Sequence, residues 1–293
     1  MTGWGRKFVI GTPYLWLGLF FLVPFVLVLK ISFAEPQLAQ PPYGPLWETG
    51  DDGKVEVTAT TENYGYLVED PFYRDAYFKA VRIAFVSTIL TLLIGYPTAY
   101  GIARARGRWR NVLLMLVVLP FWTSFLIRVY AWKVLLQGNG VINTVLMHLG
   151  LIGEPIQILY TDFAIYLGIV YSYLPFMVLP LYAALERLDL TLNEAAADLG
   201  APPWKVFVTI TLPLSVSGII AGCGLVFIPA VGEFVIPELL GGPNAPMIGR
   251  VLWNEFFANR DWPVASAVAI AMLVFLVAPI MLFQRYEARA ETP

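Results

Sequence analysis

Six long apolar stretches alternate with polar segments along this chain. Most contain about 20 residues with few charges, which is the length that an α-helix needs to cross the hydrocarbon core of a bilayer. The stretches are 11–33, 80–103, 111–135, 162–185, the run that follows 213 and ends near 231, and 264–283. We therefore expect an all-α membrane protein with six transmembrane helices.

The first apolar stretch follows Arg6 and Lys7, and a signal peptide also has basic residues before its apolar core. This stretch is longer than the core of a signal peptide, which has about 7–15 residues. No cleavage site made of small residues follows it. We therefore interpret it as the first transmembrane helix.

The polar segments predict how the chain is divided. Residues 34–79 are rich in Pro, Gly, Thr and acidic residues, and we expect an outer loop with a short strand near 55–57. Its acidity could favour a cationic ligand or a partner protein, although a solvated polar loop is the simpler interpretation. The segments 136–161 and 232–263 are expected on the same side. The expected divisions are 1–33 with the first helix, the outer (periplasmic) loop 34–79, a five-helix core at 80–285 that includes a cytoplasmic loop at 186–213, and a cytoplasmic tail at 286–293.

Positive charge is divided unevenly between the two sides of this topology. One side carries ten Lys and Arg residues, whereas the short loops of the other side carry two, Arg250 and Arg260. The 34–79 segment is left out because long translocated segments obey the charge rule poorly. Cytoplasmic loops are enriched in Lys and Arg, so both termini are expected in the cytoplasm. The ten residues are Arg6, Lys7, Arg104, Arg106, Arg108, Arg110, Arg187, Lys205, Arg285 and Arg289.

Composition supports this topology and excludes several kinds of chemistry. Of the 293 residues, 58% are hydrophobic and 14% are charged, whereas soluble domains carry about 25% charged residues. The net charge of −2 gives no indication of nucleic-acid binding. With Cys223 as the single cysteine and His148 as the single histidine, neither an intrachain disulfide nor a zinc site of Cys and His ligands is expected. There is no P-loop motif for ATP, and a membrane enzyme would need clustered histidines or a nucleophile–base pair that the sequence lacks. We expect no catalytic residues, no metal and no cofactor.

The segment from Glu194 to Pro213 is partly polar and lies between two apolar stretches. Thr191 and Glu194 have the spacing of a capping box, which predicts that a helix starts there. Alanines favour this helix, and Gly200 is a natural end for it. Pro202 and Pro203 prevent simple continuation, so a turn and a second helix from about Trp204 should follow. We therefore expect a short helix held at the membrane surface.

This segment also resembles a known family. Glu194-Ala195-Ala196, then Gly200 and Ile210-x-Leu212-Pro213, match the EAA loop of ABC importer permeases. The sequence from Val226 to Gly242 resembles the permeases of putrescine/spermidine importers, and the resemblance extends over most of the chain after about Lys79. The resemblance implies the six-helix architecture of type I ABC importer permeases in a bacterial inner membrane.

The resemblance also implies partners and a mechanism. Glu194, Ala195, Ala196 and Gly200 would form a coupling helix that is seated on an ABC ATPase dimer, whose closure would rock two membrane halves between outward and inward openings. A second, similar permease subunit would complete a heterodimer. A periplasmic polyamine-binding protein would deliver the substrate. Membrane lipid would surround the transmembrane helices.

A polyamine is a flexible cation, so its path should offer separated carboxylates and aromatic faces. The candidate carboxylates and rings are Glu233, Glu238, Glu255, Asp261, Trp122, Tyr130, Tyr171 and Tyr173. An ordinary aromatic belt or packing explains each ring equally well, and the carboxylates could instead contact a binding protein. Arg128 lies deep in an apolar stretch, where we expect an ion pair; Glu233 is one candidate partner, and a place on the pathway is the alternative.

Two other functions stay open at this stage. A permease for another small solute, such as an anion or iron, has the same architecture. A passive channel has a similar composition, although the resemblance to the EAA loop argues against it. Substrate-dependent ATP hydrolysis separates these possibilities.

Overall fold

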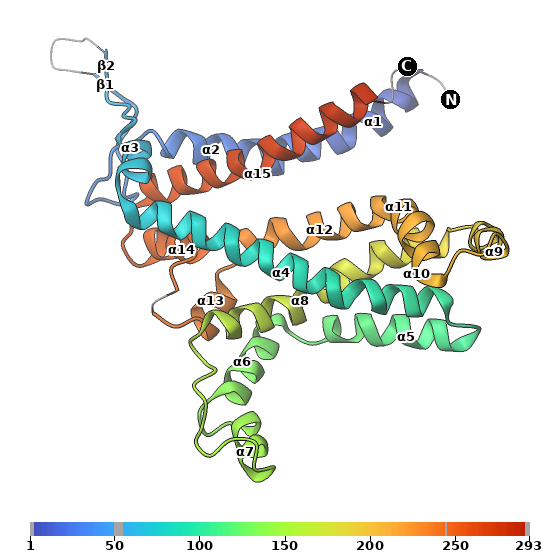
Figure 1. The fold of residues 1–293 in the computed structure, drawn as a ribbon. Coiled ribbons are helices and arrows are strands. Elements are labelled where there is room, and N and C mark those ends of the chain that lie inside the picture. The colour runs from blue at the N-terminus through green and yellow to red at the C-terminus, as the bar shows by residue number, and fades with distance from the viewer. Residues whose placement is uncertain (1–2, 50–54, 244, 291–293) are drawn as a thin grey trace. The chain divides into compact units, whose positions relative to one another are not determined.

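The computed structural model describes residues 3–49, 55–243 and 245–290, with side chains at 7–49, 55–243, 245–277 and Met281. The described chain is almost entirely helical, as expected from its sequence (Figure 1). It divides into two compact units, Met1–Asp75 with Val251–Pro293, and Ala76–Arg250. Helices α4 and α14 each have residues in both units.

The first unit is built on the two ends of the chain. Helix α1, a π-helical turn and α2 follow one another, and the apolar part of this run is Lys7–Ile31. The C-terminal helix α15 packs against α2 and α3. Strands β1 and β2 form an antiparallel hairpin with Trp47 opposite Val57, so the strand predicted near 55–57 is confirmed. The elements are α1 (Gly3–Leu17), η1 (Gly18–Leu22), α2 (Val23–Ile31), β1 (Trp47–Thr49), β2 (Val55–Val57), α3 (Glu62–Glu69) and α15 (Trp262–Ala290).

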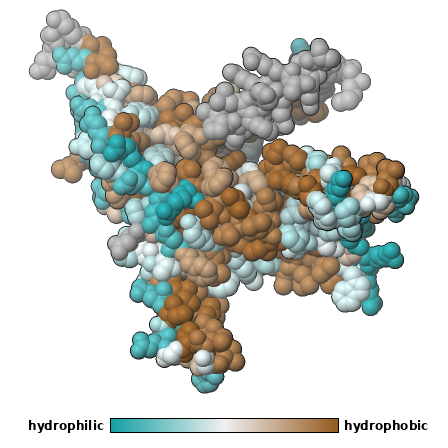
Figure 2. All heavy atoms as spheres, viewed as in Figure 1, coloured by the Kyte–Doolittle hydropathy of each residue, from teal (hydrophilic) through white to brown (hydrophobic). Residues whose placement is uncertain are grey.

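The second unit is a helical bundle in which α12 packs along α8 (Figure 1). Apolar side chains cover the bodies of its helices, and hydrophilic ones gather at the end that carries α9 (Figure 2). Its elements are α4 (Pro71–Arg104) from Ala76 onward, α5 (Arg108–Val118), η2 (Leu119–Trp122), α6 (Phe125–Leu136), α7 (Val141–His148), α8 (Asp162–Glu186), α9 (Thr191–Asp198), α10 (Pro203–Val206), η3 (Phe207–Thr211), α11 (Leu212–Leu214), α12 (Val216–Val231) and α13 (Val235–Leu240). Helix α14 (Ile248–Phe257) begins in this unit and continues into the first from Val251.

Three helical runs in the described residues are long and apolar enough to cross a membrane: Lys7–Ile31, Pro71–Arg104 and Asp162–Glu186. Up to five result if each of two bent helix pairs counts as one span. The stretch predicted at 111–135 is not one straight helix, because the chain bends by 90° between Trp122 and Phe125. Pro120 and the extended backbone at Thr123 account for this break, since the chain leaves helical geometry there.

The run leading to 231 is also bent, by 65° where α11 meets α12. Ser215 lies at this break, and its hydroxyl group is 2.8 Å from the Tyr96 hydroxyl group on α4. The predicted stretch 264–283 falls within α15, whose described apolar part, Trp262–Val277, is shorter than the other spans. The count of six helices is therefore not reached in the described residues.

The segments expected as outer loops contain helices of their own. Helix α3 and the first turns of α4 lie within 34–79, α7 lies within 136–161, and α13 and α14 lie within 232–263. Each of these short helices buries part of its surface, as Asn63, Asn143 and Ile236 do. Polar composition alone therefore underestimated the helix content of these segments.

Two glycines allow α12 to approach α8 closely. A Cβ atom at Gly218 would lie 2.6 Å from the Cβ of Ala184, and one at Gly222 would lie 2.7 Å from the Sδ of Met177. Their Gly-x-x-x-Gly spacing places both on one face of α12, where small residues let two backbones come together. The contact is part of a core that includes Val178, Leu181 and Val226.

Replacing Gly218 with valine is therefore expected to destabilise the α8–α12 contact by about 1–3 kcal/mol, since the added atoms must displace backbone and side-chain neighbours. Thermal unfolding of the purified protein in detergent measures the effect. Gly224→Val is the matched control on the same helix, because a Cβ atom there meets nothing within 4 Å. Equal melting temperatures for the two variants would contradict the close contact.

Candidate functional site

Helix α9 begins differently from the prediction. Thr191 is its first residue, and the Thr191 backbone N–H donates to the Oδ1 atom of Asp189 at 3.0 Å. This hydrogen bond lowers the pKa of the Asp189 carboxyl, which is therefore ionised at neutral pH beside the start of the helix. The predicted capping box of Thr191 and Glu194 is wrong, because Asp189 takes the role that the Thr191 side chain was expected to fill.

The end of α9 agrees with the prediction that Gly200 stops the helix. Gly200 has a φ of +81°, a left-handed conformation that glycine adopts without strain. Its N–H donates to the Ala197 carbonyl at 2.8 Å, and the Ala201 N–H donates to the Ala196 carbonyl at 3.1 Å. These two bonds form a Schellman motif, which satisfies carbonyl groups at the end of the helix.

The outward surface of α9 has side chains that no other described element covers. Glu194 and Ala195 are exposed, Ala196 is half-buried, and the Leu199 side chain is 89% exposed. The Glu194 carboxylate makes no hydrogen bond or ion pair with the described residues. This surface of α9 is therefore uncovered within the described chain.

The inward side of α9 is connected to the bundle. The Asn193 side chain lies 3.4 Å from the Thr211 hydroxyl group in the π-helical turn η3. In the same turn, Phe207 packs edge-on against Tyr96 and Tyr100 of α4, with ring centroids 5.6 and 6.1 Å apart. Packed side chains thus connect α9 with η3 and with α4.

Glu233 is buried and lies at the start of α13. Its Oε1 atom accepts the backbone N–H groups of Phe234 and Val235 at 3.1 and 3.0 Å, and that of Ile236 at 3.4 Å. The Tyr173 hydroxyl group donates to the other oxygen, Oε2, at 2.6 Å. The structure thus brings together two residues that the sequence analysis selected for the pathway, and gives the carboxylate a structural role at a helix terminus.

The other selected carboxylates also have partners. In the second unit, Glu238 forms an ion pair with Arg250. In the first unit, Glu255 accepts hydrogen bonds from the hydroxyl group of Tyr73 at 3.0 Å and from Asn259 at 2.9 Å, and Asp261 accepts the Val264 N–H at the start of α15. Glu233 and Glu238 thus lie in one compact unit, and Glu255 and Asp261 in the other.

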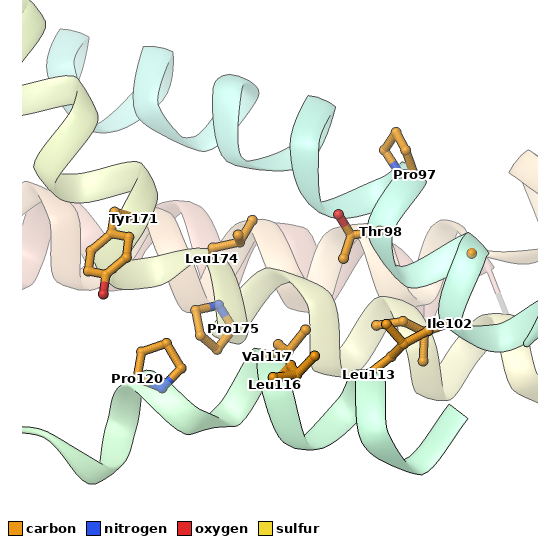
Figure 3. A pocket seen from close by; sticks show the side chains of 11 residues that line it. Pro97, Thr98, Ile102, Leu113, Leu116, Val117, Pro120, Tyr171, Leu174 and Pro175 are labelled. Carbon is orange, nitrogen blue, oxygen red and sulfur yellow. The ribbon is translucent and has the colours of Figure 1, made fainter. Parts of the chain in front are cut away.

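The selected rings are not gathered in one place. Trp122 is 74% and Tyr130 is 48% exposed, whereas Tyr171 packs edge-on against Trp132 at 5.4 Å. Tyr171 also lies toward one end of a cavity of about 520 Å³ between α4, α5 and α8 (Figure 3). The cavity lining has no charged side chain, so it does not offer a site for a cation. The lining residues are Pro97, Thr98, Gly101, Ile102, Leu113, Leu116, Val117, Pro120, Tyr171, Leu174 and Pro175.

Arg128 does not form the expected ion pair within the described residues. Its Nε and Nη1 atoms are buried and have no hydrogen-bond partner. The guanidinium group lies 5.9 Å from the ring centroid of Phe121 and 5.8 Å from that of Phe125. These aromatic contacts stabilise a cation only in part.

The sequence is similar to those of known transport proteins. Residues 91–290 match the family described as "Binding-protein-dependent transport system inner membrane component". The chain is 41% identical over 281 residues to the spermidine/putrescine transport system permease protein PotB of Haemophilus influenzae, covering 96% of this chain and 93% of the relative. It is 38% identical over 271 residues to the PotB protein of Escherichia coli, covering 92% and 93%.

The fold has a close counterpart among solved structures. A bacterial ABC transporter involved in the import of the acidic polysaccharide alginate superimposes with a TM-score of 0.67 at 18% identity, covering 99% of this chain and 98% of that one. At this identity the likeness concerns the fold alone. Together with the apolar helices, the sequence matches make the chain a multi-pass inner-membrane protein that transports and is not an enzyme. The chain belongs to the family of binding-protein-dependent transport system inner membrane components, which are the permease subunits of ABC importers.

Proposed function

We propose that this chain is the permease subunit of an ATP-driven importer that takes up putrescine and spermidine. The observation that carries the proposal is the identity of about 40% to spermidine/putrescine permeases over nearly the whole chain. The buried, hydrogen-bonded carboxylate of Glu233 beside Tyr173 is compatible with a cationic substrate. An importer of another small solute, such as an anion or iron, is the second candidate, because the fold serves both.

The proposed assembly has three further components. An ABC ATPase dimer would supply the energy, since no P-loop motif is present in this sequence. A second, similar permease subunit would complete a heterodimer, and a periplasmic binding protein would deliver the polyamine. We infer that six helices cross the membrane and that both termini and α9 face the cytoplasm, which the distribution of Lys and Arg supports.

In the proposed mechanism, α9 transmits the motion of the ATPase. Glu194, Ala195 and Ala196 would contact a cleft of the ATPase, and the left-handed turn at Gly200 would hold α9 at a fixed angle to the next segment. The contact of Phe207 with α4 and the glycine contact of α12 with α8 would carry the displacement into the bundle. Closely packed helices move as units, so the result would be a rigid-body switch between two openings.

Glu233 would both accept hydrogen bonds at the start of α13 and bind the substrate. Three backbone N–H groups hold its Oε1 atom, so the carboxylate stays in place when the partner of Oε2 changes. A polyamine ammonium group could then replace the Tyr173 hydroxyl group at Oε2. A charge-assisted hydrogen bond of this kind is stronger than a neutral one, which would favour an ammonium group over an uncharged solute. We propose Glu238, Glu255, Asp261, Trp122, Tyr130 and Tyr171 as secondary candidates along the path.

The experiment that tests the substrate is ATP hydrolysis by the reconstituted transporter with loaded binding proteins. Putrescine or spermidine is expected to stimulate hydrolysis, whereas phosphate, iron and sugars are not. Stimulation by another solute would support the role of the chain as a permease but would contradict a polyamine as the substrate. Flux that continues without ATP hydrolysis would instead identify a passive channel.

Gly200→Ala tests the coupling role of α9. The side chain imposes a strain of about 1 kcal/mol on a residue with positive φ, which should distort the end of α9 and reduce both ATPase association and uptake. Gly150→Ala is the matched control, because Gly150 also has a positive φ, open space around a Cβ atom and the same pair of turn hydrogen bonds, but follows α7. Co-purification of the ATPase and uptake in vesicles measure the effect. If both variants lose uptake equally, or neither does, α9 has no special role.

Glu233→Gln tests the substrate role of the carboxylate. The amide oxygen can still accept the three backbone N–H groups, so the melting temperature should stay close to that of the wild type, while the KM for polyamine uptake should rise about tenfold. Glu233→Ala should lower the melting temperature as well, because it leaves the N–H groups without an acceptor. Tyr173→Phe keeps the charge and should transport with little change in KM. An unchanged KM in Glu233→Gln would leave the residue with a structural role only.

A further inference from the structure

The cavity between α4, α5 and α8 lies at the depth of membrane lipid. Helices α4 and α8 are each long and apolar enough to cross a membrane, and α5 is so together with its bent continuation. At about 1.5 Å per residue, the lining residues Leu113 and Pro120 lie about 8 and 18 Å along the helical run from Arg108. Because the arginine-rich turn before α5 marks a membrane surface, the cavity lies inside the hydrocarbon core, which is about 30 Å thick.

The walls of the cavity suit an apolar ligand. The lining has no charged side chain, and the Thr98 hydroxyl group already donates to the Ile94 carbonyl at 2.8 Å within α4. Among the lining residues, Pro97, Gly101 and Leu116 are exposed, so the cavity is open to the surroundings of the bundle. At this depth the surroundings of a membrane protein are acyl chains and not water.

One end of the cavity lies next to the turn between α4 and α5. Figure 3 shows Ile102 and Leu113 at this end, whereas Pro120 and Tyr171 lie at the other. Ile102 is in the last turn of α4, and Leu113 is in the second turn of α5. An amphiphile whose chain lies in the cavity would therefore have its polar head at residues 104–110.

This end of the helices carries positive charge that no described carboxylate neutralises. Arg110 forms an ion pair with Glu186 of α8 at 2.8 Å, and the Arg104 guanidinium group lies over an aromatic ring of α4. Arg106 and Arg108 are exposed and form no ion pair with a described carboxylate. A cluster of basic residues directly beside a transmembrane helix attracts anionic lipid head groups.

We propose that the cavity binds an acyl chain of an anionic phospholipid, whose phosphate group contacts Arg106 and Arg108. The apolar lining selects the chain, and the two unpaired arginines select a negatively charged head group. The chain fills space that three membrane-spanning helices leave between them, and so stabilises their packing. This lipid site does not depend on which solute the transporter imports.

The first test uses the complete transporter in nanodiscs of phosphatidylcholine. A small amount of phosphatidylglycerol carries a photoreactive group at the end of one acyl chain, and adducts are expected on the lining residues of α4, α5 and α8. Added unlabelled phosphatidylglycerol should reduce this labelling. The same amount of additional phosphatidylcholine should not, nor should soluble glycerol 3-phosphate, which lacks the chain. Equal labelling of all apolar helices, or equal competition by phosphatidylcholine, would overturn the proposal.

Gly101→Leu tests the part of the site that holds the chain. Gly101 lines the cavity, and a Cβ atom there meets nothing within 4 Å, so the new side chain occupies the cavity without displacing a neighbour. Labelling of the cavity should be lost. Gly224→Leu, at an equally open glycine on α12, is the matched control and should be labelled as the wild type is. Equal labelling of Gly101→Leu and the wild type would contradict the site.

The two arginines are tested together by Arg106→Gln with Arg108→Gln. Each basic residue near an anionic head group contributes about fivefold to binding, so labelling by phosphatidylglycerol should require roughly twentyfold more lipid. Arg187→Gln with Lys205→Gln removes two charges from the same predicted side of the membrane and should leave labelling unchanged. An equal effect of the two pairs would show that the arginines attract lipid without a site.

A photoreactive residue at Leu116 identifies what occupies the opening of the cavity. Leu116 is 56% exposed and belongs to the lining, so an adduct with phospholipid is expected. Adducts with the second permease subunit and none with lipid would overturn the proposal, since another protein would then cover the cavity.

Discussion

Polar groups among apolar helices need partners, because the hydrocarbon core of a bilayer offers none. This requirement accounts for many of the specific contacts of the second unit. At the bend between α11 and α12, the Ser215 hydroxyl group meets that of Tyr96. At the start of α13, the Glu233 carboxylate accepts hydrogen bonds from three backbone N–H groups and from the Tyr173 hydroxyl group. Among the described residues, the exceptions include Arg128, whose buried Nε and Nη1 atoms have no hydrogen-bond partner, and the buried hydroxyl groups of Ser87 and Ser172.

The same requirement explains how a permease can be rigid and still move. The breaks near Thr123 and at Ser215 interrupt helices at points where side chains and neighbouring turns replace backbone hydrogen bonds. Between the breaks, α8 and α12 are held together by contacts too close for a side chain at Gly218 or Gly222. A push on α9 would therefore be transmitted through η3 to a packed helix pair rather than be absorbed within it.

Hydropathy was sufficient to predict the long, uninterrupted apolar helices. The stretch at 162–185 corresponds to α8 almost residue for residue, because length and apolar composition suffice to identify a long helix. The end of α9 was predictable for a different reason, since only glycine adopts the conformation at Gly200 without strain. The resemblance of Glu194–Pro213 to a family motif then selected α9 as the surface that we propose contacts the ATPase.

Other features depend on contacts between distant residues and could not be predicted. Pro120 alone does not specify the 90° angle of the bend near Thr123, since α5 packs against α8 while α6 also packs against α7 and α13. The start of α9 differs because Asp189 competes for the Thr191 N–H, and this competition depends on the loop conformation. Glu233 was selected as a substrate ligand, but its contact with Tyr173 joins residues 60 positions apart. Sequence spacing says nothing about such a pair.

The most direct test of the whole account is where α9 makes contact in the assembled transporter. A photo-crosslinking residue at Leu199, which is 89% exposed, should form an adduct with the ATPase, whereas one at Leu151, which is 67% exposed near the end of α7, should not. That result would place α9 on the cytoplasmic side and in contact with the subunit that hydrolyses ATP. An adduct with the ATPase at Leu151 and not at Leu199 would contradict both the orientation and the coupling role of α9.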